Sequence, residues 1–168
     1  MERKRLLNER NQFKGSFLPY TSFKNREWDM VNETVWVYTN RIVNLCIIQN
    51  KNKELIMIDA GMPKDYKVIM KDISEKFSGR KPVAVILTHG HFDHIADINA
   101  FHINYPESII YTSEYGVEQF CSDKKNFSLY HEKSMIFHGD MKKIEILKEN
   151  DKIKLFSDVY MNVIETPG

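Results

Sequence analysis

Three histidines and an aspartate lie within six residues near the middle of the chain, in the segment His89-Gly90-His91-Phe92-Asp93-His94. Imidazole nitrogens and carboxylate oxygens are ligands that zinc and other divalent metals take in proteins. His89 and His91 are two residues apart, so on an extended exit from a strand their side chains point the same way and can bind one ion. Asp93 and His94 follow where the chain turns into a helix, so their side chains diverge and could bind a second ion. The segment therefore predicts a metal site.

A plainer alternative is that these histidines lie on a surface loop and that Asp93 caps the helix that follows. Capping explains the aspartate but gives no reason for three neighbouring histidines, so we favour metal binding. The other histidines are weaker candidates. His102 falls on the apolar side of a predicted helix over 93–104, as a packed histidine would. His131 lies in a polar stretch without a regular period, and His138-Gly139-Asp140 is typical of a turn.

The metal-binding segment follows directly after a predicted strand. Residues 83–87 form a short, continuous apolar run bounded by Pro82 and Thr88, which is typical of a strand covered on both faces. We expect this strand in the middle of a sheet. Open α/β sheets keep their active sites at the carboxyl ends of their strands, where these histidines would lie.

The rest of the chain mixes hairpins with helical crossovers. Before the metal-binding segment, the pattern predicts an antiparallel start and then a helix, with strands at 35–38, 42–48 and 55–58 and the helix over 64–77. After it, we expect the helix over 93–104, a strand at 109–112, a short helix at 113–120, and strands at 144–147, 153–156 and 159–165. This order predicts one α/β (α+β) domain, a sandwich with helices on the outside.

Residues 1–30 show no sustained period and are expected to form an N-terminal extension to a domain of residues 31–168. The basic residues of this extension are dispersed along it and not clustered. Dispersed charges favour a solvated lead-in over the alternative, a tail that binds nucleic acid.

Composition and charge narrow the function. The 168 residues carry a net charge of +1 and are 42% hydrophobic and 28% charged, as in a soluble globular protein. No global field attracts nucleic acid or an anionic membrane, which favours a small-molecule substrate. No apolar run has the length of a membrane span or the place of a signal sequence, so we expect no membrane contact and a cytoplasmic location. Cys46 and Cys121 lack the spacing of a redox pair or a structural zinc site.

Three segments together resemble the metallo-β-lactamase superfamily. Its hallmark is a His-x-His-x-Asp-His motif after a buried strand, which residues 89–94 match. The segment Ile58-Asp59-Ala60-Gly61 is similar to the Asp-x-Gly turn that ends the family's opening hairpin, and Thr166-Pro167-Gly168 is similar to the start of its Thr-Pro-Gly-His motif. The resemblance covers about residues 34 to 168. It implies a four-layer αββα sandwich and a metal-dependent hydrolase.

Carried over residue by residue, the resemblance implies that His89 and His91 bind a first metal ion and that Asp93 and His94 bind a second. Asp93 would also orient a metal-bound hydroxide, the nucleophile of the implied reaction. Asp59 would hydrogen bond to a ligating imidazole or to loop amides. The implied cofactor is Zn²⁺, two ions in a complete protein, and iron or manganese also suit these ligands. The implied substrate is a small-molecule ester, thioester, lactone or β-lactam.

The sequence departs from the family pattern at its C-terminal end. The family's next metal ligand is the histidine directly after Thr-Pro-Gly, and this chain ends at Gly168. A bridging aspartate, a late histidine and the rest of the second half-sandwich would follow. We therefore expect the N-terminal part of a hydrolase, with the C-terminal half-sandwich incomplete. The alternatives are a non-catalytic metal-binding or regulatory module, paired with a chain that supplies the missing half, and a nuclease-like member, which the near-neutral charge disfavours.

Overall fold

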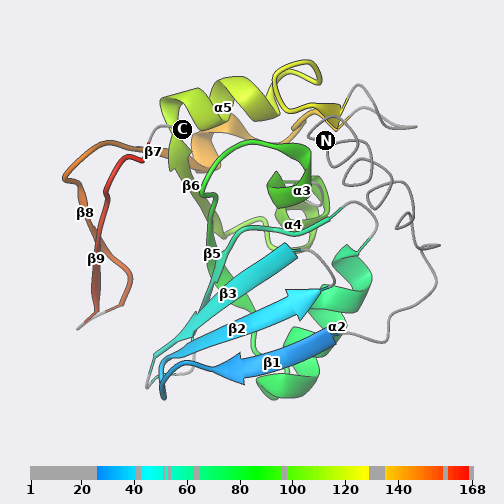
Figure 1. Ribbon diagram of the computed structural model, residues 1–168, viewed down its shortest axis with the longest axis vertical. Coiled ribbons are helices and arrows are strands. Elements are labelled where there is room, and N and C mark those ends of the chain that lie inside the picture. Colours follow the sequence, from blue (N-terminus) through cyan, green and yellow to red (C-terminus); the bar gives the residue numbers. More distant parts are fainter. Residues whose placement is uncertain are drawn as a thin grey trace, which may run out of the picture.

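The computed structural model of the chain (Figure 1) describes residues 26–40, 43–50, 52, 54–62, 65–95, 98–128, 135–156 and 159–166. Most of the expected N-terminal extension lies outside the described residues, as do His131, Pro167 and Gly168. Among the helices of the described part, none has the length and apolar character needed to cross a membrane.

A seven-stranded mixed sheet forms the centre of the fold, in the order β1-β2-β3-β4-β5-β6-β7. Its strands are β1 (Arg26–Met30), β2 (Val35–Asn40), β3 (Val43–Gln49), β4 (Leu55–Ile58), β5 (Pro82–Ile86), β6 (Ile109–Ser113) and β7 (Ile144–Leu147). Neighbours from β1 to β4 pair antiparallel, which confirms the expected antiparallel start, and neighbours from β4 to β7 pair parallel. Parallel strands need long crossovers, and helices lie between them in the sequence.

Strand β1 is a difference from the sequence prediction, because it takes the last five residues of the expected extension, Arg26–Met30. It pairs with β2 in a register that sets Trp28 opposite Tyr38. Trp28 packs against the core, while Glu27 and Asp29 beside it are exposed. Charged side chains are common on edge strands, where they discourage pairing with other chains. Trp28 is the one apolar residue of β1 that packs against the core, so the alternation is too short to predict a strand.

Helices cover one face of the sheet. They are α2 (Tyr66–Lys76), α3 (Phe92–Ile95), α4 (Ile98–Asn104) and α5 (Glu114–Phe120). Figure 1 shows α2, α3 and α4 on the side of the sheet away from the C-terminal strands. One large core joins this helix layer to the sheet; its helical members include Ile69, Ile73, Ile95, Ile98, Phe101 and Phe120, and its strand members include Tyr38, Leu45, Ile47, Met57, Val85 and Ile110. The helix predicted over 93–104 is found as α3 and α4.

The other face of the sheet is partly covered by a small antiparallel pair, β8 (Lys152–Lys154) and β9 (Tyr160–Asn162). Phe156, between these strands, is 5% exposed and packs with Ile56, Ala84 and Ile86 of the large sheet. Strand β5 is therefore covered on both faces, as expected for a central strand, although Val83 near its start is exposed. Helix layer, large sheet and second small sheet confirm the expected mixed α/β sandwich.

Candidate metal centre

The metal-binding segment begins where β5 ends, and the neighbouring strand brings Asp59 to the same place. β4 and β5 run parallel, with Ile58 opposite Ile86, so the residues after both strands emerge at one edge of the sheet. The backbone N–H of Asp59 donates to the Ile86 carbonyl at 2.8 Å. Asp59 itself has a positive φ of 64°, a conformation in which aspartate is found more often than most residues. The turn after β4 thus aims a carboxylate at the loop after β5.

Asp59 is buried, 4% exposed, and its carboxylate contacts the first and last residues of the loop. Its Oδ1 accepts a hydrogen bond from the backbone N–H of Thr88 at 2.8 Å, and its Oδ2 lies 2.8 Å from Nδ1 of His94. A carboxylate can only accept, so the proton of His94 must be on Nδ1. In the neutral ring, Nε2 of His94 then keeps a free lone pair, which is the state that a metal ligand needs.

The pKa of His94 is raised, first because its ring donates to Asp59 and then through the charges of Asp59 and Asp93, while burial opposes the rise. The pKa of His89 is lowered, first by burial and then by repulsion from His94 and His91. A lowered pKa keeps His89 neutral near pH 7, and a neutral imidazole is the form that binds metal.

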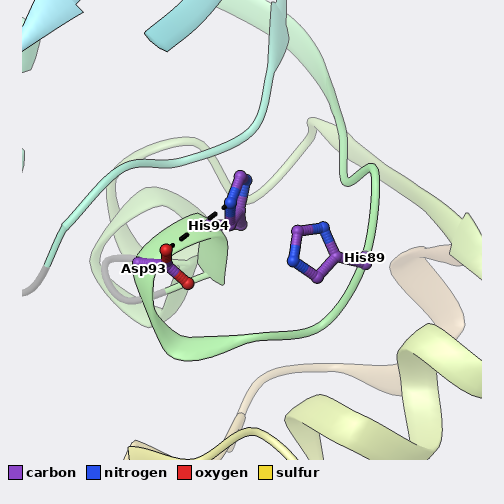
Figure 2. A group of neighbouring side chains, drawn as sticks. All are labelled: His89, Asp93 and His94. Atoms are coloured by element: carbon purple, nitrogen blue, oxygen red, sulfur yellow. Dashed lines mark ion pairs between the residues drawn. The ribbon is translucent and has the colours of Figure 1, made fainter. Parts of the chain in front are cut away.

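Three of the predicted ligands come together. His89, Asp93 and His94 each offer one nitrogen or oxygen atom, and these atoms all lie within 4.8 Å of one another. Figure 2 shows the two rings and the carboxylate gathered inside the loop that runs from β5 into α3. Nε2 of His94 is 3.7 Å from Oδ2 of Asp93, and the ring centroids of His89 and His94 are 4.1 Å apart. Two imidazoles and a carboxylate form a donor set that fits a divalent transition metal.

His91 stands beside this group without belonging to it. Its ring is nearly perpendicular to the His89 ring, and the centroid of its ring is 4.6 Å from that of the His89 ring and 4.8 Å from that of the Phe127 ring. Its carbonyl accepts from the backbone N–H groups of His94 and Ile95, which starts α3. The division into one ion held by His89 and His91 and a second held by Asp93 and His94 stays a prediction.

Residues from a later part of the chain hold the loop, and no sequence pattern predicted them. The N–H of Gly90 donates to Oε1 of the buried Gln119 in α5 at 2.9 Å. A Cβ atom at Gly90 would lie 2.4 Å from Cβ of Gln119 and 2.6 Å from the carbonyl oxygen of Gly116. Gly90 is therefore required by the close approach of α5. In addition, the N–H of Phe92 donates to the carbonyl of Asn126 at 2.9 Å.

The weaker histidine candidates have other surroundings. The His102 ring lies edge-on to Phe137, 5.7 Å between centroids, and its Nε2 accepts from the N–H of Asp140 at 3.1 Å. Asp140 in turn caps the short 3-10 helix η3 (Met141–Lys143) by accepting from the N–H of Lys142. His138 is exposed. These contacts explain the His138-Gly139-Asp140 turn without a metal.

Comparison with known proteins decides the family. The pattern of one protein family, described as the metallo-beta-lactamase superfamily, matches residues 38–168. The chain belongs to this superfamily. This confirms the resemblance carried by residues 58–61 and 89–94. Asp59 and the three grouped side chains all lie within the matched region.

Curated relatives of this superfamily member are similar over only part of their length. A protein named "Probable metallo-hydrolase YflN", from Bacillus subtilis (strain 168), is 36% identical over 85 residues, which are 49% of this chain and 32% of that protein. Ribonuclease J from Pyrococcus abyssi (strain GE5 / Orsay) is 25% identical over 117 residues, 59% of this chain and 26% of that protein. The chain spans about a third of the length of these relatives, or less.

Solved structures agree on the fold. The metallo-beta-lactamase GOB-18 from Elizabethkingia meningoseptica superposes with a TM-score of 0.70 at 20% identity, covering 84% of this chain and 52% of that one. Identity this low shows the fold alone. The likeness confirms the expected metallo-β-lactamase fold. The matched part of this chain covers about half the length of the solved protein.

Proposed function

We propose that this chain carries metal ligands of a metal-dependent hydrolase that acts on a small-molecule ester, thioester, lactone or β-lactam. The observation that carries the proposal is the convergence of His89, Asp93 and His94, with the buried Asp59 carboxylate behind His94. Membership of the superfamily and similarity to a protein named as a metallo-hydrolase support it. Because the chain spans only part of its relatives, the proposal concerns the whole protein in which these residues work.

The residues that would hold metal are His89, Asp93 and His94, joined by His91 when a second ion is bound. Zinc suits this set best, since no thiolate is present and imidazole predominates, and iron or manganese also suit it. A divalent ion bound here would supply Lewis acidity, which makes water acidic enough to deprotonate near pH 7 and polarises the bond under attack.

The chain's own residues have separate tasks in this proposal. Asp93 is the more accessible carboxylate, with 35% of its side chain exposed against 6% for Asp59. It can therefore accept a hydrogen bond from the attacking water and orient it toward the substrate. Asp59 is the buried carboxylate; it holds the His94 ring and so fixes the direction of its Nε2.

A nucleic acid is the second candidate substrate, because one relative is named ribonuclease J. The net charge of +1 argues against it, since proteins that grip a phosphate backbone concentrate positive charge on one face. We therefore propose a small molecule as the substrate and neither nucleic acid nor membrane as a partner.

Metal content tests the proposal. We expect the wild-type protein to take up zinc, and His89→Ala and His94→Ala each to lose most of that uptake, measured by elemental analysis after dialysis. His138→Ala is the matched control, because His138 is exposed and lies outside the group. Unchanged zinc content in both site variants would contradict the metal site. Zinc uptake without hydrolysis across a panel of esters, thioesters, lactones and β-lactams would instead favour a non-catalytic metal-binding module.

A further inference from the structure

The hydroxyl of Thr88 lies between the Asp59 carboxylate and the His89 ring. Its Oγ1 is 3.0 Å from Oδ1 and 2.9 Å from Oδ2 of Asp59, and it is also 3.0 Å from Nδ1 of His89. The backbone N–H of the same residue donates to Oδ1 of Asp59 at 2.8 Å. Thr88 is therefore fixed to Asp59 through both its main chain and its side chain, in contact with one of the grouped histidines.

The protons of this chain of contacts can be assigned from chemistry. A carboxylate has no proton to give, so the single hydroxyl proton of Thr88 must point to Asp59. The Thr88 oxygen then presents lone pairs to His89, and Nδ1 of His89 must be the donor of their 3.0 Å contact. In a neutral imidazole a proton on Nδ1 leaves Nε2 as the acceptor.

We infer that Thr88 is a positioning residue that sets the tautomer of His89, and that Asp59 thereby orients two metal ligands with one carboxylate. Asp59 contacts His94 directly, at 2.8 Å, and reaches His89 through the Thr88 hydroxyl. Both rings are left with a free Nε2. The inference rests on the metal-binding part of the proposed function and on no statement about substrate.

The Thr88 hydroxyl affects the His89 tautomer because water, which would replace it, would not fix that tautomer. Thr88 is exposed, so a water molecule can replace its oxygen if the hydroxyl is removed. Water can donate to Nδ1 of His89 as readily as accept from it, and it is not held by Asp59. The ring would then sample both tautomers, and only one of them offers Nε2 to a metal. Partners that fix the tautomer of a ligating histidine contribute about 10- to 100-fold in metal affinity.

The first test needs no variant and no metal. Nitrogen-15 NMR of the metal-free protein, at a pH where His89 is neutral, distinguishes a protonated Nδ1 from a protonated Nε2. We expect the proton of His89 on Nδ1. A proton on Nε2 would overturn the inference, whatever the protein hydrolyses.

The second test compares two substitutions at one position. Thr88→Val keeps the shape and removes the hydroxyl, whereas Thr88→Ser keeps the hydroxyl. We expect zinc affinity, measured by competition with a chromophoric chelator, to fall about tenfold or more in Thr88→Val and to stay near the wild-type value in Thr88→Ser. Thr39→Val is the matched control, since it removes a hydroxyl that contacts Asn44 across β2 and β3 and lies outside the grouped ligands.

Each outcome of these tests has a separate meaning. Equal zinc affinity in Thr88→Val and Thr88→Ser, with an unchanged His89 tautomer, would overturn the positioning role. If Thr88→Val does not fold, the metal-free spectrum of the wild type and of Thr88→Ser still decides the tautomer. If both tests succeed and no hydrolysis is found, the hydrolase proposal fails and the positioning role stands.

Discussion

At the scale of single residues, the buried carboxylate of Asp59 organises the candidate site. It accepts from three donors, the N–H and hydroxyl of Thr88 and the ring of His94. Replacing a buried acceptor that has several donors costs unfolding free energy. Each donor left without a partner is shielded from water and has no hydrogen bond in the folded protein. The sequence predicted that Asp59 would accept from an imidazole or from loop amides, and its contacts include both kinds of donor. Its role beside a metal ion stays a prediction, and the role of Thr88 was not predicted.

Asp59→Asn tests this arrangement with a side chain of the same size. The new amide brings N–H donors to a place where donors already converge, so at least one of them lacks an acceptor. We expect zinc affinity to fall about 10- to 100-fold and the metal-free protein to lose about 1–3 kcal/mol of unfolding free energy. Competition titration and urea unfolding measure the two effects.

Asp151→Asn is the control for this substitution. Asp151 is another carboxylate that accepts a backbone hydrogen bond, from the N–H of Lys148, but it lies in an exposed turn before β8. We expect it to leave zinc affinity unchanged. Equal zinc affinity in the two variants would contradict an orienting role for Asp59.

At the scale of elements, α5 holds the metal-binding loop in place. Gln119 in α5 binds the N–H of Gly90, and Gly116 in the same helix comes so close to Gly90 that a side chain there would collide with it. The loop is therefore positioned by two strands from one side, through Asp59, and by a helix from the other. Neither contact of α5 with Gly90 is visible as a pattern in the sequence, because Gln119 and Gly116 lie far from Gly90 along the chain.

Gly90→Ala separates this packing from ordinary glycine effects. Its Cβ would overlap Gln119 and the Gly116 carbonyl, so α5 or the loop must shift. We expect a loss of about 1–3 kcal/mol in unfolding free energy, together with weaker zinc binding. Gly79→Ala is the comparison: no heavy atom lies within 4 Å of a Cβ there, but φ is +75°, so about 1 kcal/mol should be lost to backbone strain alone.

Zinc titration distinguishes the two glycine variants. Gly79 lies after α2, outside the grouped ligands, so its replacement should leave zinc affinity unchanged. A Gly90→Ala protein that is as stable as the wild type and binds zinc as tightly would show that α5 does not constrain the loop.

At the scale of the whole molecule, the sequence was informative wherever structure follows from local pattern. Strand β7 was predicted with its observed bounds, 144–147, and the strand before the histidines was placed mid-sheet because its apolar run is continuous. Strand β1 was missed, because Trp28 is its one apolar side chain that packs against the core and a single such residue gives no alternating pattern. The supports supplied by Gln119 and Asn126 depend on tertiary packing and have no local signature.

The second face of the sheet provides a test of the layered fold. Phe156 is buried against Ile56, Ala84 and Ile86, so Phe156→Ala should leave a cavity and cost about 3 kcal/mol of unfolding free energy. Ile164→Ala is the control, because Ile164 is 73% exposed and surface changes usually stay within about 0.5 kcal/mol. Urea unfolding measures both. Equal stability of the two variants would show that the β8–β9 pair does not pack on the sheet.

The short span of the site along the chain bears on how it forms during synthesis. Asp59 and His94 are only 35 positions apart, so both histidines and the carboxylate that governs them leave the ribosome within one crossover unit. Gln119, which holds Gly90, follows 29 positions after that glycine. The residues that orient His94 are therefore synthesised together, whereas the contact that holds Gly90 requires α5.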